Sequence, residues 1–209
     1  MCYFNSMKKI TVSIALILIL QACSYNASFR QDFVPITPSI SLSQKLDGKG
    51  LIVMSSLEEN YIYSDNPASF TGGGTKLTLP LGLIVKQISM TVFDSIFSKG
   101  VYFSNSSADT SGYLIVIKPD IRIDNYKYDQ LENLGFAVTP KVSISANIEV
   151  QDNNNSVIFT KDYSYIDLKA PAYLFAASPD EKVNELIHQA IHKIMLESLS
   201  DIRNNLIDS

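Results

Sequence analysis

Two histidines that stand four residues apart, His188 and His192, are the first candidates for chemistry in this sequence. In a helix this spacing brings both side chains to one side, where two imidazoles can bind a zinc ion. A zinc-protease motif also requires a glutamate directly after the first histidine as the general base, but Gln189 occupies that place. The sequence suggests no third ligand, so we interpret both histidines as the flank of an apolar helix stripe and predict no metal site.

A second candidate is the glycine-rich stretch 72–76, which ends in Thr75 and Lys76 and invites comparison with a phosphate-binding loop. Such a loop needs a glycine directly before the lysine and a strand directly before its first glycine. The sequence offers neither, so we interpret the stretch as a turn.

Carboxylates are the third candidate, and they occur at Asp120, Asp124, Glu149 and Asp167 in strand-like or loop segments. Their spacings are those of any solvated sheet face, although a glycosidase pair stays open because its two members need only be neighbours in space. No Gly-x-Ser-x-Gly elbow occurs, and two histidines on one predicted helix leave few places for a Ser-His-Asp triad. We predict no catalytic residue and no cofactor.

The N-terminal segment carries the clearest signal. Lys8 and Lys9 precede an apolar run from Ile10 to Leu20, which has about the length of a signal-peptide core and is too short to span a bilayer well. A small residue and a cysteine, Ala22 and Cys23, follow directly. The alternative is an uncleaved N-terminal anchor.

This boundary resembles the lipobox of bacterial lipoproteins, a Leu-x-Ala/Gly-Cys pattern that Leu20, Ala22 and Cys23 match. The resemblance implies that Cys23 receives a diacylglycerol, that residues 1–22 are removed as a signal peptide, and that the new amino group is acylated, for example with palmitate. Several acyl chains anchor a protein far more firmly than one. Ser24 stands where an aspartate would imply retention in the inner membrane, so the resemblance implies an outer-membrane protein that faces the periplasm.

Removal of residues 1–22 leaves 187 of the 209 residues, enough for one domain with a substantial core. The formal charge changes from −4 to −6 because Lys8 and Lys9 are lost. A mildly acidic surface argues against a nucleic acid partner, which requires clustered lysine and arginine. Acylation of Cys23 also leaves the mature chain without a thiol, and therefore without a disulfide or a cysteine-based site.

Residues 23–46 are rich in serine, asparagine and glutamine and contain Pro35 and Pro38, which predicts an extended, flexible tether. Phe29, Phe33 and Val34 give an alternative, in which this segment packs on the domain. The sequence leaves both interpretations open. Residues 47–209 are expected to form a single periplasmic domain.

Several strands are predicted within that domain. The apolar run Leu51–Met54 follows two glycines and predicts a buried strand. A long strand is expected over residues 113–128, where Pro119 marks a bulge or an edge. Strict alternation over residues 142–150 predicts an antiparallel strand with one buried and one solvated face, and residues 152–156 form the turn to the next strand.

Two helices are predicted. Apolar residues that recur every fourth position from Gly82 onwards predict a helix that ends near Lys99 and Gly100. The second helix begins with a capping box, Ser178-Pro179-Asp180-Glu181. The core stripes comprise Ile84, Val85, Ile88, Val92, Phe93 and Ile96 in the first helix, and Val183, Leu186, Ile187, Ala190, Ile191, Ile194, Met195, Leu199 and Ile202 in the second.

This element order predicts an α+β fold, a two-layer sandwich in which a mainly antiparallel sheet carries two helices on one face. With the lipobox and the tether, it is similar to the small periplasm-facing lipoproteins of the YajG, LPS-assembly and ABC-transport-auxiliary types. That resemblance implies binding to protein partners or amphipathic lipids and gives no catalytic residue.

We therefore consider two functions. The first is a non-enzymatic outer-membrane lipoprotein that binds an envelope protein through the open sheet face, an edge strand or the tyrosine-bearing loop 58–70. The alternative is a carrier of lipid or a small amphiphile, which predicts an apolar cavity of roughly 300 Å³ or more between helices and sheet.

Overall fold

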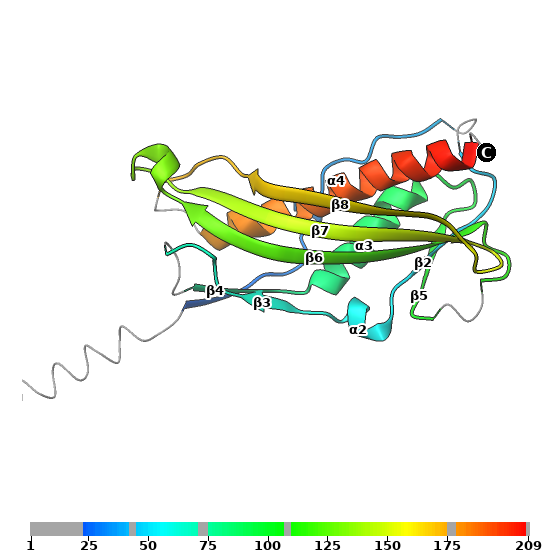
Figure 1. The fold of residues 1–209 in the computed structure, drawn as a ribbon, viewed down its shortest axis with the longest axis horizontal. Helices are drawn as coiled ribbons and strands as arrows, with labels where there is room; N and C mark the ends of the chain where they lie inside the picture. The colour runs from blue at the N-terminus through cyan, green and yellow to red at the C-terminus, as the bar shows by residue number, and fades with distance from the viewer. Residues whose placement is uncertain (1–22, 42–44, 71–74, 107–109, 175–178, 208–209) are drawn as a thin grey trace, which may run out of the picture.

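The computed structural model describes residues 23–41, 45–70, 75–106, 110–174 and 179–207, and Figure 1 shows its helices and strands. The described part of the chain has a five-stranded sheet in the order β5-β2-β6-β7-β8 and a three-stranded sheet in the order β1-β4-β3. The strands are β1 (Cys23–Asn26), β2 (Gly50–Val53), β3 (Tyr63–Asp65), β4 (Thr75–Leu79), β5 (Val101–Ser104), β6 (Ile115–Asp129), β7 (Thr139–Asp152) and β8 (Val157–Lys169). The helices are α2 (Ser56–Glu59), α3 (Leu81–Asp94) and α4 (Pro179–Ile207), with short 3-10 helices η1 (Gln31–Phe33) and η3 (Leu131–Asn133).

The α+β class expected from the sequence is confirmed, and the sheets are mixed: the long strands pair antiparallel, while shorter pairings are parallel. The strand β2 runs parallel to both β5 and β6, and β1 runs parallel to β4. All four residues of β2 are buried, as is typical of a parallel strand covered on both faces. The chain between β2 and β5 contains α2, β3, β4 and α3, which is the long crossover that parallel pairing requires.

Strands β6, β7 and β8 form an antiparallel meander, the longest paired region of the molecule. The predicted alternation in β7 is confirmed, since Val142, Ile144, Ala146, Ile148 and Val150 are all buried. The opposite face is less open than predicted. Ser143 and Gln151 on that face are also buried, and the Ser143 hydroxyl accepts a hydrogen bond from the Asp167 backbone at 3.2 Å.

Helices α3 and α4 pack against each other and share one core with the sheet. Every residue of the two predicted stripes is buried and belongs to a single cluster with the inward side chains of β2, β6 and β7. The helix α3 is shorter than predicted, because it ends at Asp94, whose carboxylate accepts a hydrogen bond from the Val101 backbone at 3.2 Å. The helix α4 begins at Pro179, while Ser178, its predicted N-cap, lies outside the described residues. No helix in the described ranges is both long and apolar enough to cross a membrane.

The described residues of the predicted tether, 23–41 and 45–46, lie along the domain. In β1, Cys23 pairs with Thr75 of β4, and the Ala27 backbone donates a hydrogen bond to the Thr78 carbonyl at 2.7 Å. Further along, the rings of Phe29 and Phe33 contact His188 of α4, with centroids 5.6 and 5.7 Å from its ring. Most of this segment is therefore attached to the folded part by strand pairing and aromatic packing.

The short helix α2 lies across the start of α3. A capping box closes its N-terminus, because the Ser55 side chain accepts a hydrogen bond from the Glu58 backbone at 3.3 Å while the Glu58 side chain accepts one from the Ser55 backbone at 2.6 Å. The Gly82 backbone donates to the Tyr61 carbonyl at 3.0 Å, and a Cβ on Gly82 would lie 2.0 Å from the Glu58 carbonyl oxygen. Only glycine permits this approach of α2 to α3.

We predict that Gly82→Ala lowers the free energy of unfolding by about 1–3 kcal/mol, because the added methyl group overpacks the contact between α2 and α3. Urea unfolding followed by circular dichroism measures this change. The matched control is Thr91→Ala, an exposed position on the same helix, for which we expect a change within about 0.5 kcal/mol. Equal stabilities of the two variants would contradict the close approach.

Candidate functional site

Both histidines are engaged by the N-terminal segment. The Nδ1 atom of His188 lies 2.8 Å from the Asn184 carbonyl oxygen, and its Nε2 accepts a hydrogen bond from the Arg30 backbone at 3.1 Å. The Nε2 atom of His192 lies 3.2 Å from the Thr37 hydroxyl. A neutral His188 that donates from Nδ1 and accepts at Nε2 has no lone pair left for a metal. The two histidines therefore attach residues 30–37 to α4. The side of α4 that both histidines share serves as a structural contact with this segment.

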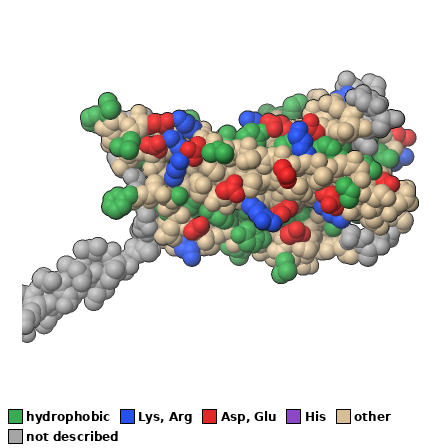
Figure 2. Space-filling view, viewed as in Figure 1, with side chains coloured by type: hydrophobic (Ala, Val, Ile, Leu, Met, Phe, Trp, Pro, Cys, Tyr) green, Lys and Arg blue, Asp and Glu red, His purple; other side chains and the backbone are tan. Residues whose placement is uncertain are grey.

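The four candidate carboxylates lie on the face of the five-stranded sheet opposite the core, and each has a polar partner. Asp120 pairs with Arg122 at 2.8 Å and Asp124 accepts from Ser145 at 2.8 Å. Glu149 pairs with Lys118 at 3.3 Å, and Asp167 pairs with Lys127 at 2.7 Å. Figure 2 shows acidic and basic side chains interspersed over this face. The described residues contain no group of three or more His, Cys, Asp or Glu that could hold a metal.

As for the glycine-rich stretch, Gly72–Gly74 lie outside the described residues, and Thr75 and Lys76 begin β4.

A concave site with mainly apolar walls lies beside β6. A cavity of about 390 Å³ opens between α2, the start of α3 and four consecutive residues of β6, Pro119 to Arg122. Its walls are mainly apolar, with Glu58, Asp120 and Arg122 as charged residues. The complete lining is Met54, Leu57, Glu58, Tyr61, Leu81, Gly82, Val85, Pro119, Asp120, Ile121 and Arg122.

Part of the edge of β6 faces this cavity without a partner strand. The strand β2 pairs with β6 only from Ile115 to Ile117, whereas β7 accompanies the other side to Asp129. From Tyr126 onwards the chain around Ala68 and Ser69 covers the edge, through a hydrogen bond from the Ala68 backbone to the Tyr126 carbonyl at 2.7 Å. Among the described residues, no strand pairs with residues 118–125 on the side away from β7.

Pro119 indicates which backbone groups this edge offers. A proline within a sheet is tolerated where its missing N–H would face an unpaired edge. Backbone groups alternate in direction along a strand, so the N–H and C=O groups of Ile121 and Ile123 face the same side as the Pro119 nitrogen. Unpaired donors and acceptors therefore line one wall of the cavity. The sequence-based interpretation of Pro119 as an edge or bulge position agrees with this placement.

Polar contacts connect α2, which forms the opposite wall, to α3 and to the chain after β5. Lys86 of α3 forms an ion pair with Glu59 of α2, which also accepts a hydrogen bond from the Asn105 side chain. These two hydrogen bonds, first that of Lys86 and then that of Asn105, lower the pKa of the Glu59 carboxyl and keep it ionised. Lys86 lies 3.9 Å from the centre of the Phe103 ring as well. Two exposed side chains, Leu57 and Tyr61, project from this wall.

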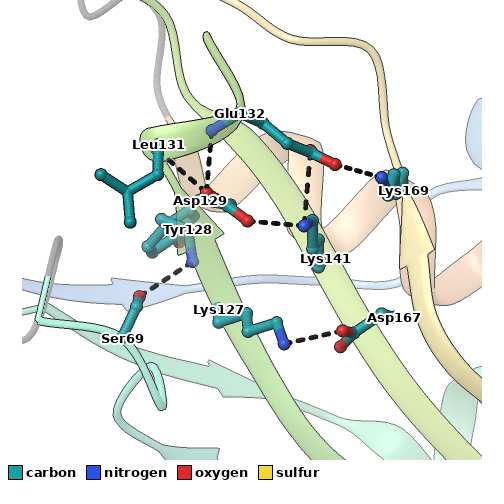
Figure 3. Close-up of polar contacts among 9 residues, drawn as sticks. All are labelled: Ser69, Lys127, Tyr128, Asp129, Leu131, Glu132, Lys141, Asp167 and Lys169. Carbon is teal, nitrogen blue, oxygen red and sulfur yellow. Dashed lines mark hydrogen bonds and ion pairs between the residues drawn. The ribbon is translucent and has the colours of Figure 1, made fainter. Parts of the chain in front are cut away.

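A second fixed feature lies where β6 turns into β7 (Figure 3). The almost buried Lys141 pairs with Asp129 at 2.6 Å and Glu132 at 3.4 Å, and Glu132 also binds Lys169. Asp129 in addition accepts hydrogen bonds from the Leu131 and Glu132 backbones, at 3.0 and 3.2 Å. The Lys141 hydrogen bond lowers the pKa of Asp129, so this network stays charged and holds the turn at residues 130–138.

The cavity and the free edge together can bind an extended peptide or a compact apolar group. The edge supplies directional hydrogen bonds, and the cavity supplies apolar area with a charged rim. No arrangement of a nucleophile with a general base is found among the described residues of this site. The space between α3, α4 and the sheet, where a carrier ligand was predicted, is filled by fully buried side chains of both helices.

Sequence reasoning identified parts of this site and missed others. It named the loop 58–70 and an edge strand as candidates, but it did not find α2 or the role of Leu57. The capping-box spacing of Ser55 and Glu58 was a usable signal for α2. The contacts of His188 and His192 with residues 30–37 had no local signal, because the partners are more than 150 positions apart.

The sequence matches no protein-family model and no curated protein. Its structure is similar to a Xanthomonas campestris protein assigned to the family model DUF330, with a TM-score of 0.54 and 12% identity over 88% of this chain and 98% of that one. A neuraminyllactose-binding hemagglutinin homolog from Helicobacter pylori gives a TM-score of 0.43 and 15% identity, over 80% of this chain and 90% of that one. The PelC dodecamer of Paraburkholderia phytofirmans gives a TM-score of 0.33 and 12% identity, over 78% of this chain and 93% of that one. The first similarity shows a related fold. The TM-scores of the other two are too low to support an argument.

We predict that stability falls as the pH drops below about 6.5, the ordinary pKa of histidine. Burial lowers the pKa of both His188 and His192 in the folded protein, so the folded state binds fewer protons than the unfolded state in this range. Their contribution is complete above the unfolded pKa and is lost as the histidines are forced to protonate. Nearby Asp32 raises the pKa of His188 and Arg30 lowers it, and neither outweighs burial.

Urea midpoints between about pH 7.5 and about pH 5.5 measure this loss. The double variant His188→Gln/His192→Gln serves as the control, because its midpoints should change much less over the same range. A wild-type protein with constant stability across this range would contradict the assignment.

Proposed function

We propose that this protein is a lipid-anchored lipoprotein of the outer membrane that faces the periplasm. In this proposal it is a non-enzymatic binding or accessory subunit of a cell-envelope assembly or transport complex. Cys23 carries the lipid, and the folded part binds an envelope protein. The observation that supports the binding role most directly is the free edge of β6 beside an apolar cavity. Proteins with this combination recognise partners by adding a strand to the edge and placing a side chain in the cavity.

The arrangement of layers supports the same proposal. We infer that α3 and α4 both cover one face of the five-stranded sheet, because their buried residues share a cluster with the inward side chains of β6 and β7. The other face, with its paired charges, then stays available to a partner. Two further hollows on this side are both lined by Asp120, which also lines the main cavity, so the three sites meet at one position of β6.

The contact of Cys23 with the domain gives the proposed anchor a mechanical consequence. Because Cys23 is the first residue of β1 and pairs with Thr75, an acyl group on it would hold the domain directly at the bilayer. The acyl chains would supply about 0.8 kcal/mol per buried methylene, which is ample for stable attachment. The domain would then hold the groove, formed by the cavity and the free edge of β6, at a fixed distance from the membrane.

A second candidate function, transport of lipid or a small amphiphile, is favoured by the size of the cavity. Its 390 Å³ would accommodate part of an acyl chain against Val85 and Ile121, with Arg122 near a polar headgroup. Mass spectrometry of organic extracts from the purified protein distinguishes the two functions. A lipid carrier should yield one extractable lipid per chain, whereas a protein-binding subunit should yield none.

We predict that Cys23→Ala moves the protein from the membrane fraction to the soluble fraction after signal processing or export, since no acyl chain can then be attached. Cys2→Ala is the matched control, because Cys2 is the other cysteine of the chain and precedes the predicted cleavage point. Fractionation with immunoblotting, together with metabolic labelling by an alkyne fatty acid, measures the outcome. Labelling that persists in Cys23→Ala would refute the anchor.

We predict that Leu57→Glu combined with Tyr61→Ala weakens binding of the envelope partner by about tenfold or more, equal to about 1.4 kcal/mol. Both residues line the cavity wall and are exposed, Leu57 at 86%, so the unfolding free energy should change by less than about 1 kcal/mol. The control is Ile36→Glu, since Ile36 is also an exposed apolar residue, at 95%, and lies outside the cavity. Affinity purification with quantitative mass spectrometry compares the three proteins. If Ile36→Glu and the cavity variant retain the same partners at the same level, the groove is not the binding site.

A further inference from the structure

Large apolar side chains gather at one end of the molecule. Leu131, Leu134 and Phe136 lie in or beside the turn between β6 and β7, and each is more than three-quarters exposed. Phe70 and Leu174 are exposed at 104% and 70%. A single exposed leucine is ordinary in a soluble protein, but five such side chains at one end form a surface that needs an explanation. We call these five residues the apolar tip.

Hydrogen bonds bring together the segments that carry the apolar tip. Val138 and Tyr173 exchange two backbone hydrogen bonds, at 2.9 and 3.0 Å, in an antiparallel bridge whose register sets Leu174 opposite Ala137, the residue after Phe136. The Tyr128 backbone donates to the Ser69 hydroxyl at 2.9 Å, which brings Phe70 to the foot of the same turn (Figure 3). In Figure 2, hydrophobic side chains gather at the end where this turn lies.

The turn is also held firmly enough to present these side chains. The network of Asp129, Glu132, Lys141 and Lys169 fixes its base. Leu134 adopts a positive φ of 51°, a conformation that asparagine or glycine tolerates better than leucine. Its side chain is 86% exposed, so neither packing nor backbone geometry accounts for a leucine there.

The same end of the fold contains Cys23. The strand β1 begins there and pairs with the start of β4, five residues after Phe70 (Figure 1). The apolar run Ile10–Leu20 precedes Cys23 directly in the sequence. Whether that run stays as an anchor or is replaced by acyl chains on Cys23, the bilayer adjoins this end of the domain.

We propose that the apolar tip is a second membrane contact, which inserts Phe70, Leu131, Leu134, Phe136 and Leu174 into the interface of the bilayer that holds Cys23. This inference rests on the proposed attachment at Cys23 and adds to it the orientation of the domain. Apolar side chains in such contacts reach about 5–10 Å into the boundary between headgroups and acyl chains. The attraction is hydrophobic, since the lysines at the base of the turn are already paired with carboxylates.

Depth-dependent fluorescence quenching on the full-length, acylated protein tests this contact. The protein is reconstituted into vesicles of phosphatidylethanolamine and phosphatidylglycerol, some of which carry a nitroxide on the acyl chain. A bimane label is placed at Leu131→Cys, at Phe70→Cys, or at Val157→Cys as the matched control. Val157 is an exposed apolar residue beside the β7–β8 turn at the opposite end of β7.

We expect severalfold stronger nitroxide quenching at positions 70 and 131 than at 157, and the difference should persist at about 1 M salt, where exposed charges are screened. A second variant combines Leu131→Ser, Leu134→Asn and Phe136→Ser, with Val157→Ser/Ile158→Ser as its control. The triple variant should keep its fold, because Leu134→Asn suits the backbone there, but it should reduce quenching at position 70 to the level at 157.

The outcomes separate this inference from the proposed anchor. Protein that floats with the vesicles but shows equal quenching at 131 and 157 overturns the apolar tip and leaves the anchor intact. Protein that does not float with the vesicles overturns both. A label at 131 that is shielded from aqueous iodide without nitroxide quenching assigns the tip to a protein contact and overturns the bilayer assignment.

Discussion

The structure depends on a mismatch in length between two neighbouring strands. The strand β6 has 15 residues, while β2, which pairs with it, has 4. The parallel pairing therefore stops at Ile117, and the rest of that edge must find another partner or stay open. The chain around Ala68 and Ser69, which follows β3, covers it from Tyr126 onwards, and α2 stands away from the part between. The cavity, the unpaired backbone groups and the position of Asp120 all follow from this one mismatch.

The second constraint is the attachment of the N-terminal segment to α4 and β4. Because Cys23 lies in β1, the proposed anchor would have no slack, and it would orient the domain with the apolar tip towards the membrane. Ile121 and Asp129, at the base of the tip, are eight positions apart along β6, a rise of about 26 Å along the strand. In this proposed arrangement the cavity and the free edge of β6 would face sideways, clear of the lipid headgroups, where a periplasmic partner would reach them.

The sequence predicted the parts of the fold that depend on local periodicity. Alternation in β7 and the stripes of α3 and α4 gave the buried residues directly, because burial on one face imposes period 2 or 3.6. It did not predict the parallel pairing of β2, since the run Leu51–Met54 is apolar throughout and contains no information about direction. Nor could it give the free edge of β6 or the histidine contacts, because these depend on where distant segments stop. Only Pro119 indicated the free edge of β6, and only loop 58–70 indicated the opposite wall of the cavity.

The most direct test of the binding role is in-cell photocrosslinking from a benzoylphenylalanine at position 61, on the cavity wall, in the acylated protein and in Cys23→Ala. We expect one discrete adduct with an envelope protein, which depends on Cys23 and is absent when the photocrosslinker stands at position 157. Adducts that are equally abundant at both positions, or that contain lipid alone, would contradict a protein-binding groove.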